Sequence, residues 1–379
     1  MGSGPAGQGP EGGCALRIDC IGFRLALTVP FAISRGTAET RDICIARIEH
    51  RGATGYGEAS PSAFYGDNPE KARHAITGAA SVLGEILNEG NPGESIPRGG
   101  VPDNGVSCKG PFDFEGIALR LFERFPESPS GRAAVEMALW DLAGKLTGLP
   151  VFKMLGLESG PLPPSSFTVG VTDPGIARGM LDSLRRCPIL KAKVGFGNEE
   201  ALLELLHGET DAVLRVDANE GWSLDEAIEK INAYRDRFSI EIFEQPLSRK
   251  DLEGYRKLRQ ATDALIIVDE SIVRAEDVAP WQGLADGVNI KLMKCGGLLD
   301  AERIASAAAS LGMKVMLGCM VESSLAITAA AHLATLADYC DLDGNLLISN
   351  DPFTGVKARD GLLALSGLPG LGAATVSGL

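Results

Sequence analysis

The sequence predicts an α/β fold in which an eight-stranded barrel follows an α+β domain. Eight short apolar runs alternate with helical segments after about residue 165, which is typical of repeated βα units. Charged residues end five successive runs, namely Lys193, Asp217, Glu244, Asp269 and Lys291, at intervals of 24, 27, 25 and 22 residues. In barrels of this kind, polar residues at the carboxyl ends of the strands converge on one mouth. An open doubly wound sheet is the alternative.

The composition is that of a folded protein that acts on small molecules. Its 379 residues are 45% apolar and 23% charged, which suits a large core and two domains. The formal net charge of -14 argues against nucleic acids and anionic membranes as partners, because both are bound through basic patches. No GxGxxG motif opens a helix after a strand, so a dinucleotide site is not expected.

Targeting and redox signals indicate a cytoplasmic protein. The eight cysteines form no CxxC pair, which argues against a zinc ribbon or a redox dithiol. Residues 1–13 have no basic and apolar signal regions and are interpreted as a flexible leader. The longest uncharged run, residues 323–337, is too short to span a bilayer.

The first domain is expected to combine antiparallel strands with helices. Residues 15–58 alternate between apolar and polar side chains, as in strands joined by hairpins. A helix is predicted over 69–87, followed by a loop over 88–111 that is rich in glycine and proline. Residues 130–156 have a strong helical pattern with a Gly-Leu-Pro stop.

The second part of the chain contains the predicted barrel. Its strands are expected at 166–171, 189–194, 212–218, 240–246, 265–270, 287–292, 314–319 and 339–343. Ser223 and Glu226 have the spacing of a capping box at the start of one intervening helix. Another helix is predicted from Asp300 to Leu311, where Gly312 ends it.

Three acidic residues at consecutive strand ends predict a metal site. Asp217, Glu244 and Asp269 would bring three negative charges close together, and such carboxylates repel unless a cation neutralises them. A single acid in such a place is usually a helix cap or the partner of a lysine, but three in a row favour a ligand set. All-oxygen ligation with positions open for water and substrate suits Mg²⁺.

Two lysines flank the acids in the predicted barrel. Lys193 and Lys291 would face each other across the metal, because strands two and six lie on opposite sides of an eight-stranded barrel. The alternative for each is a structural ion pair with one of the acids. Burial and a nearby cation, supplied by Lys191 on the same side of its strand, would lower a lysine pKa towards that of a general base.

Two bases on either side of a metal suggest a carbon acid held between them. A metal that binds a substrate carboxylate stabilises the enediolate formed when the α-proton is removed. Removal of the proton from one face and its return to the other inverts the centre. The predicted reaction class is therefore racemisation or epimerisation.

Six strings, in order along the chain, resemble the muconate-lactonising subgroup of the enolase superfamily: RAAVEMALWDL, KAKVG, VDANEGW, EQP, VDES and NIKLMKCGG. The resemblance implies a modified TIM barrel, (β/α)7β, with an N-terminal α+β capping domain that the C-terminal segment completes. It divides the chain into a leader (1–13), capping domain (14–158), barrel (159–345) and returning C-terminal segment (346–379). It makes Lys193 and Lys291 the acid/base pair. It implies one Mg²⁺ per subunit, bound by the three strand-end acids.

The string Asp341-Leu342-Asp343 indicates which activity of the subgroup to expect. Alternation along the last strand makes both aspartates face the barrel mouth, and the alternative is a cap or turn before Gly344. The pair resembles the DxD of dipeptide epimerases, which holds the free amino group of a dipeptide. We therefore expect an isomerase that inverts the α-carbon of the C-terminal residue of L-Ala-L/D-Glu or of a hydrophobic dipeptide. The alternative enzymes are N-acyl amino acid racemase and o-succinylbenzoate synthase. A non-catalytic binding protein is the remaining alternative.

The resemblance also implies residues that line the substrate pocket. Arg35, after the Pro-Phe pair, would meet a glutamate side chain, although Gly36 occupies the equivalent place and Arg35 could be a surface charge. Thr168, Cys319 and Val321 would line the pocket, with simple packing as the alternative. Lys191 is also expected among the substrate-binding residues. A homo-oligomer that recycles peptidoglycan peptides is expected.

Overall fold

The computed structural model describes residues 16–33, 36–89, 112–170, 173–195, 197 and 199–376. The predicted leader, Arg35 and nearly all of the predicted loop over 88–111 lie outside these residues. The exception in the loop is its first two residues, which belong to helix α1 (Pro69–Glu89).

The N-terminal part is built on a three-stranded antiparallel sheet. Strands β1 (Arg17–Ile33), β2 (Gly36–His50) and β3 (Ala53–Ala59) lie in sequence order, as the alternating pattern predicted. Arg51 and Gly52 form the hairpin between β2 and β3, both with positive φ. The buried side chains of Ala46 and Ile48 face the helices that cover the sheet, because these residues are in register with Gly57 and Gly55, which contact one of these helices.

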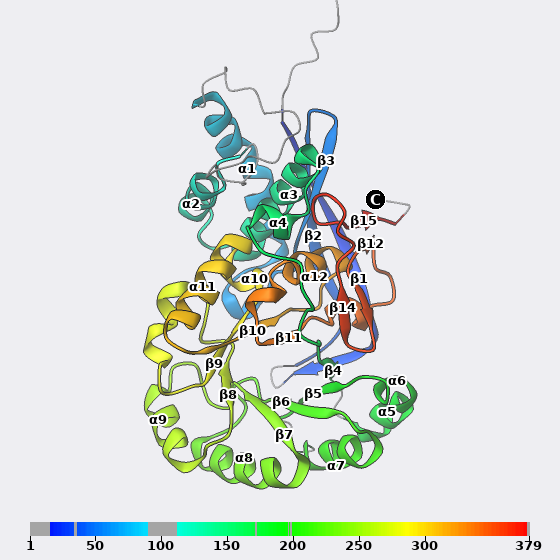
Figure 1. The fold of residues 1–379 in the computed structure, drawn as a ribbon, viewed down its shortest axis with the longest axis vertical. Helices are drawn as coiled ribbons and strands as arrows, with labels where there is room; N and C mark the ends of the chain where they lie inside the picture. The colour runs from blue at the N-terminus through cyan, green and yellow to red at the C-terminus, as the bar shows by residue number, and fades with distance from the viewer. Residues whose placement is uncertain are drawn as a thin grey trace, which may run out of the picture.

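Helices cover one face of this sheet (Figure 1). Helix α1 is followed by α2 (Phe114–Arg124), α3 (Pro129–Thr147) and α4 (Val151–Met154). The predicted helix over 130–156 is therefore two helices. The break occurs because Gly148 adopts a left-handed φ of 75° and Pro150, two residues later, cannot donate a backbone hydrogen bond.

Helix α3 is the buried centre of this domain. Every residue from Pro129 to Gly144 is buried. The helix can approach the sheet closely because β3 presents glycines to it: a Cβ atom on Gly57 would lie 1.9 Å from Ala134 O, and one on Gly55 would lie 2.0 Å from Ala138 O. The GATGYGEA segment is thus a contact surface for α3.

Eight parallel strands form the barrel. They are β4 (Phe167–Val169), β5 (Ile189–Lys193), β6 (Val213–Asp217), β7 (Ile240–Glu244), β8 (Ile266–Val268), β9 (Gly287–Ile290), β10 (Lys314–Gly318) and β11 (Tyr339–Asp341). Their spatial order follows the sequence. A parallel bridge between Ser165 and Cys340 joins the first strand region to the last, which excludes an open doubly wound sheet. Each strand is observed where it was predicted, although several are shorter.

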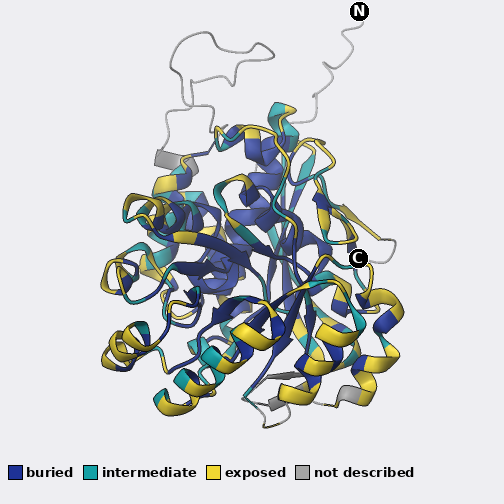
Figure 2. Ribbon diagram, turned by 60° about the horizontal axis from the view of Figure 1, so that its bottom comes forward, coloured by how far each residue is buried: buried dark blue, intermediate teal, exposed yellow. Residues whose placement is uncertain are grey.

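Helices surround the barrel strands, and Figure 2 shows buried strands inside exposed helical faces. The helices between and after the strands are α5 (Pro174–Gly179), α6 (Leu181–Leu184), α7 (Glu199–Glu209), α8 (Leu224–Phe238), α9 (Leu252–Ala261), α10 (Leu292–Cys295), α11 (Leu298–Ser310) and α12 (Ser324–Ala331). Between β8 and β9 the chain forms two 3-10 helices, Ala275–Asp277 and Ala279–Trp281. The capping box of Ser223 and Glu226 is confirmed.

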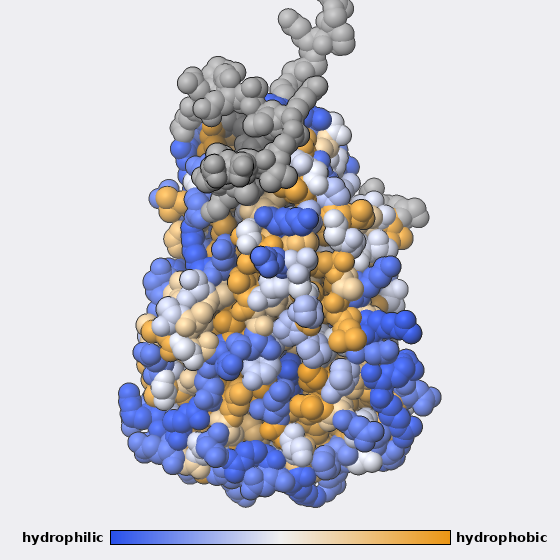
Figure 3. Space-filling model, in the orientation of Figure 1, coloured by the Kyte–Doolittle hydropathy of each residue, from blue (hydrophilic) through white to orange (hydrophobic). Residues whose placement is uncertain are grey.

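The outer faces of the barrel helices are polar. In Figure 3 hydrophilic residues dominate the lower rim, where α7, α8 and α9 lie in Figure 1. In α8, Ala227, Ile231, Tyr234 and Phe238 are buried, as expected for a helix with one apolar face. Within the described ranges, no helix combines the length and apolar character that crossing a membrane requires.

The C-terminal segment returns to the N-terminal domain. It contains β12 (Phe353–Thr354), β13 (Lys357–Arg359), β14 (Leu362–Ala364) and β15 (Ala374–Thr375), which pair as two small sheets. The buried carboxylate of Asp141 in α3 accepts hydrogen bonds from Leu371 N and Tyr56 N, both at 2.9 Å. One side chain thus ties helix α3 to the sheet and to the returning segment.

The close packing of α3 on β3 yields a stability prediction. Substituting Gly57 by alanine should lower the free energy of unfolding by about 3 kcal/mol or more, because the backbone carbonyl of Ala134 cannot move away from the new methyl group. Gly84→Ala in α1, where a Cβ atom meets nothing within 4 Å, is the control and should raise that free energy by up to about 1 kcal/mol. Urea unfolding measures both, and equal stability of the two variants would contradict the packing argument.

Candidate active site

The five charged residues lie at the carboxyl ends of five neighbouring strands. Lys193, Asp217 and Glu244 are the last residues of β5, β6 and β7, and they are register partners in sequence, Lys193 with Asp217 and Asp217 with Glu244. Asp269 and Lys291 directly follow β8 and β9. All five are at most 7% exposed. The strand-end prediction is therefore confirmed in position.

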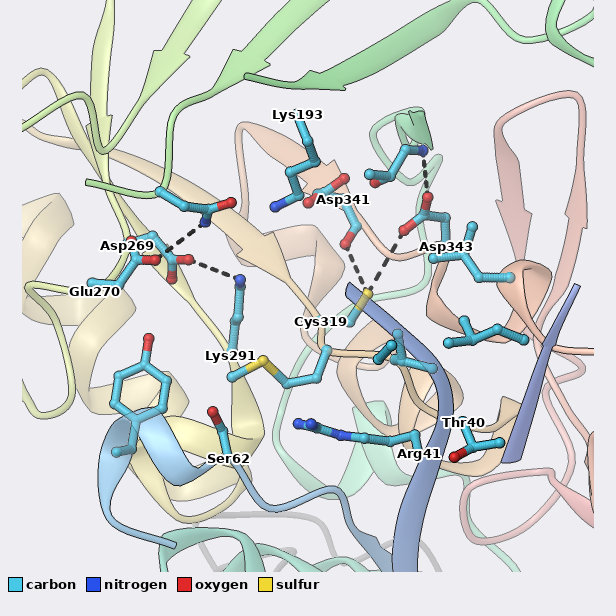
Figure 4. A pocket seen from close by; sticks show the side chains of 18 residues that line it. Thr40, Arg41, Ser62, Lys193, Asp269, Glu270, Lys291, Cys319, Asp341 and Asp343 are labelled. Carbon is cyan, nitrogen blue, oxygen red and sulfur yellow. Dashed lines mark hydrogen bonds and ion pairs between the residues drawn. The ribbon is translucent and has the colours of Figure 1, made fainter. Parts of the chain in front are cut away.

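A cavity of about 290 Å³ opens at this mouth, between the barrel and the N-terminal domain (Figure 4). This volume is near the lower end of the range for small-molecule sites. Predicted site residues on its wall are Thr168, Lys193, Asp269, Lys291, Cys319, Val321, Asp341 and Asp343. The N-terminal domain contributes Leu27, Ala38, Thr40, Arg41, Ser62 and Tyr65. The cavity is therefore closed by the N-terminal domain on one side.

Lys191, which was expected to bind substrate, is not among the residues that line the cavity and instead contacts three carboxylates. Its Nζ lies 3.0 Å from Asp217 Oδ2, 2.7 Å from Glu244 Oε2 and 2.7 Å from Asp341 Oδ2. Burial lowers the pKa of Lys191, but the three carboxylates outweigh burial and raise it well above its usual value. Lys191 is a permanent cation that connects the strand-end acids to the last strand.

Each of the two cavity lysines is paired with one strand-end aspartate. Lys193 Nζ lies 2.6 Å from Asp217 Oδ2, and Lys291 Nζ lies 2.8 Å from Asp269 Oδ2. Asp269 is also bound by Lys294, whose Nζ lies 2.5 Å from Asp269 Oδ1 and donates to Asn289 O at 3.0 Å. Lys294 belongs to the NIKLMKCGG string but was assigned no role from the sequence.

The predicted lowering of a lysine pKa is wrong for Lys291 in this structure. Burial does lower its pKa, and the cation of Lys191 acts in the same direction. The carboxylates of Asp269, Glu244 and Asp217 act against both and raise the pKa above its usual value. The ion pair with an acid, which was the alternative for this lysine, is present between Lys291 and Asp269.

The three strand-end acids have very different pKa values. Burial raises the pKa of Glu244 to about 7, and the neighbouring charge of Asp217 acts in the same direction. Burial also disfavours the charged forms of Asp217 and Asp269, but the lysines beside them outweigh it and lower both pKa values. This pattern is that of a site with more negative charge than its lysines neutralise.

The donor set at the strand ends fits a hard divalent cation. Asp217, Glu244 and Asp269 present carboxylate oxygens from three adjacent strand ends, which is the ligand chemistry of Mg²⁺. The raised pKa of Glu244 reflects a place where further positive charge would be stabilising. Within the described ranges, no group of three acids, histidines or cysteines is arranged in metal-binding geometry. The ammonium group of Lys191 contacts both Asp217 and Glu244.

Backbone strain supports the orientation of Asp269. Gln245, directly after β7, has a left-handed φ of 38° and is fully buried. Its Oε1 accepts a hydrogen bond from Asp269 N at 2.8 Å, and its Nε2 donates to Tyr255 Oη at 2.9 Å. Strained residues of this kind concentrate at functional sites, where the surrounding hydrogen bonds hold them. The EQP string thus positions the neighbouring strand end.

Asp341, the last residue of β11, and Asp343, two residues beyond it, both line the cavity (Figure 4). Asp341 accepts a hydrogen bond from Ser166 Oγ at 2.6 Å, and Asp343 accepts one from Thr168 N at 2.5 Å. Asp343 is the N-cap residue of the 3-10 helix Gly344–Leu347, and its backbone O accepts a hydrogen bond from Leu346 N at 2.8 Å. The turn of the alternative is therefore present, but the side chain of Asp343 makes no capping bond. Burial and the charge of Asp341 raise the pKa of Asp343 to about 6.

Three of the four remaining predicted pocket residues line the cavity, and the fourth lies outside the described residues. Thr168, Cys319 and Val321 line the cavity, and Cys319 Sγ donates to Asp341 O at 3.2 Å. Arg35 lies outside the described residues. Arg41 lines the cavity from β2 and was not predicted, because it sits in the alternating string RDICIA with no feature that marks it.

Comparisons with known families agree with this geometry. Residues 177–376 match the family described as Enolase C-terminal domain-like, and residues 117–156 match the Mandelate racemase / muconate lactonizing enzyme, N-terminal domain. The first match covers more than half of the chain.

Characterised relatives cover nearly the whole chain. An L-Ala-D/L-Glu epimerase of Bacteroides thetaiotaomicron is 34% identical over 95% of this chain and 88% of its own length. A hydrophobic dipeptide epimerase of Roseobacter litoralis is 33% identical over 90% of this chain and 94% of its own length. A dipeptide epimerase of Enterococcus faecalis, crystallised with Mg and the dipeptide L-Leu-L-Tyr, superposes with a TM-score of 0.81 at 29% identity, over 94% of this chain and 98% of its own. The chain therefore belongs to the mandelate racemase and muconate-lactonising enzyme family of the enolase superfamily.

Proposed function

We propose that this protein is a Mg²⁺-dependent dipeptide epimerase that inverts the α-carbon of the C-terminal residue. The observation that carries the proposal is that Lys193, Lys291 and the pair Asp341 and Asp343 all line one cavity. Two bases can act on a carbon centre, and two carboxylates can receive an ammonium group. The relatives named above, which act on dipeptides, support the same conclusion.

The two lysines are proposed to exchange the α-proton. One lysine, in its neutral form, removes the proton from the α-carbon, and the other, as an ammonium group, donates a proton to the opposite face. Their strands, β5 and β9, are separated by β6, β7 and β8 in the sheet, so the side chains enter the cavity from different sides (Figure 4). Asp217 and Asp269 orient the two ammonium groups through the ion pairs described above.

The strand-end acids are proposed to hold one Mg²⁺ per subunit. Asp217, Glu244 and Asp269 would be its ligands, and Lys191 and Lys294 would keep their carboxylates in place. When bound, the ion supplies positive charge that stabilises the negative charge developing on the substrate carboxylate.

The aspartate pair supports a substrate with a free amino group. Within the part of the chain that the structure describes, Asp341 has an ion pair with Lys191, whereas Asp343 has no ion pair and is bound by Thr168 and by a long Cys319 Sγ contact. An ammonium group would compensate the buried charge of Asp343. The substrates of N-acyl amino acid racemases and o-succinylbenzoate synthases carry no such group, so these two alternatives leave Asp343 unexplained.

Three further properties belong to the proposal. We place the enzyme in the cytoplasm, in the recycling of peptidoglycan peptides, as a homo-oligomer. We also propose that residues 14–158 and 346–379 act together as the cap over a barrel formed by residues 159–345. The ties of Asp141 to Leu371 and of Val151 to Gly370 support this division.

The two-base mechanism predicts complementary defects in lysine variants. Lys193→Ala and Lys291→Ala should each lower epimerisation by about 100-fold or more, because the proton cannot be both removed and returned. In D₂O with Mg²⁺ and an L,L-dipeptide or its L,D epimer, each variant should exchange the α-proton of only the epimer whose proton faces the remaining lysine. NMR measures exchange and inversion separately. The exposed Lys250 gives the control variant Lys250→Ala, and inversion that persists in either active-site variant would contradict the roles.

The proposed binding of the substrate amino group at Asp343 predicts that KM for dipeptides depends on this residue and on pH. Because the carboxyl pKa of Asp343 is raised to about 6, protonation below pH 6 removes its negative charge and should raise KM for dipeptides. Asp343→Asn should raise KM about tenfold at pH 7.5, as expected for loss of one charge-assisted contact, and should remove the rise of KM below pH 6. Steady-state kinetics from pH 5 to 8 test this. An unchanged pH profile in the variant would contradict the assignment.

The metal assignment predicts a loss of Mg²⁺ binding without loss of the fold. Isothermal titration calorimetry should detect one site per chain in the wild type, and Glu244→Gln should weaken it by about tenfold or more because a ligand charge is removed. Asp236→Asn, which changes an exposed acid of α8, is the matched control. Binding that is equal in Glu244→Gln and wild type would exclude Glu244 as a ligand, and EDTA should abolish epimerisation reversibly.

A further inference from the structure

Asn289 is a buried amide inside the barrel that contacts one of the proposed metal ligands. It lies on β9, two residues before Lys291, so its side chain points to the same side of the strand. Asn289 is fully buried, and its Nδ2 donates to Glu244 Oε1 at 2.9 Å. Among the described residues, Asn289 Oδ1 has no hydrogen-bond partner. The contact with Glu244 therefore orients the amide.

The neighbouring strand leaves room for this amide. Gly318 is the last residue of β10, which pairs with β9. A Cβ atom on Gly318 would lie 2.5 Å from Asn289 Oδ1 and 2.8 Å from Asn289 Nδ2. A larger residue at this position would displace the amide, so Gly318 allows Asn289 to reach Glu244.

The three strand-end acids share one pattern, in which the two oxygens of each carboxylate have different partners. One oxygen of each acid contacts Lys191, Lys193 or Lys291. The other oxygen accepts a hydrogen bond from a donor outside this set of lysines. These donors are Asn289 Nδ2 for Glu244 at 2.9 Å, Asn219 N for Asp217 at 3.0 Å and Lys294 Nζ for Asp269 at 2.5 Å. Each acid therefore presents one oxygen to the lysines while its second oxygen is already bound.

Carboxylates that offer one oxygen each suit a small cation. Mg²⁺ requires a regular shell of six oxygens, whereas Ca²⁺ takes six to eight and accepts both oxygens of one carboxylate. The donor to Glu244 is a neutral side chain, unlike the backbone donor to Asp217 and the charged donor to Asp269. It can therefore be replaced without a change in the charge of the site.

We propose that Asn289 is a positioning residue that selects Mg²⁺ over Ca²⁺, because it holds Glu244 Oε1 and leaves one oxygen of Glu244 for the metal. The inference rests on the proposed metal ligands and names the residue that decides between divalent cations. Groups that hold a ligand from behind are a known determinant of metal affinity. Without the amide, Glu244 is free to present both oxygens, which favours Ca²⁺.

The test compares the binding of two cations to the full chain by isothermal titration calorimetry. Asn289→Leu replaces the amide by an apolar side chain of similar size that has no donor. Asn232→Leu makes the same change on α8, where Asn232 Nδ2 donates to Ala261 O at 3.2 Å, and serves as the matched control. The wild type and Asn232→Leu should bind Mg²⁺ more tightly than Ca²⁺. In Asn289→Leu the ratio of the Ca²⁺ Kd to the Mg²⁺ Kd should fall about tenfold or more.

A second variant covers the case in which Asn289→Leu does not fold. Gly318→Ala keeps the amide but displaces it, so it should lower the same ratio. A merely structural role of Asn289 would weaken the binding of both cations equally, and an unchanged ratio in the folded variants overturns the inference while Glu244 stands as a ligand. A wild type that prefers Ca²⁺ also overturns it. A wild type that binds neither cation overturns both the inference and the metal assignment.

Discussion

The charge balance at the barrel mouth is the interaction on which the site depends. Lys191 lies within 3.0 Å of carboxylates from three different strands, and all four groups are almost completely buried. A buried ion that loses one partner is strongly destabilised, by roughly 3 to 5 kcal/mol. The same cation favours the charged forms of Asp217, Glu244 and Asp341, although burial and the charge of Asp217 still raise the pKa of Glu244 to about 7. Lys191 therefore contacts both the proposed metal ligands and Asp341 of the aspartate pair proposed to bind the substrate amino group.

The second requirement is that the N-terminal domain stays docked on the barrel. Glu58, at the end of β3, accepts hydrogen bonds from the backbone and hydroxyl groups of Ser323, which follows the β10 strand end. Glu136 of α3 accepts one from Leu299 N in α11 at 2.9 Å. These buried contacts place the cavity wall from the N-terminal domain, including Arg41, opposite the lysines. Packing therefore fixes the part of the cavity wall that comes from the N-terminal domain relative to the lysines of the barrel.

Much of the site could be predicted from the sequence because the βα unit of a barrel repeats at a nearly constant interval, which shows where each strand ends. Once the apolar runs were located, Lys193, Asp217, Glu244, Asp269 and Lys291 had to converge, and the structure confirms their positions. What could not be predicted depends on contacts between distant segments. The pKa of Lys291 depends on how close it lies to Asp269, and this distance cannot be read from the sequence. The sequence likewise has no motif that marks Lys191 as a lysine placed between two acids. The position of Arg41 in the cavity depends on how β2 lies over the barrel.

The central claim is that two lysines act on opposite faces of one α-carbon while the aspartate pair holds the amino group. A crystal structure with Mg²⁺ and an L,L-dipeptide tests it most directly. The account predicts that the α-carbon of the C-terminal residue lies between Lys193 Nζ and Lys291 Nζ, and that the amino group contacts Asp343. A dipeptide with both lysines on the same face of that carbon, or with its amino group directed away from Asp343, would contradict it.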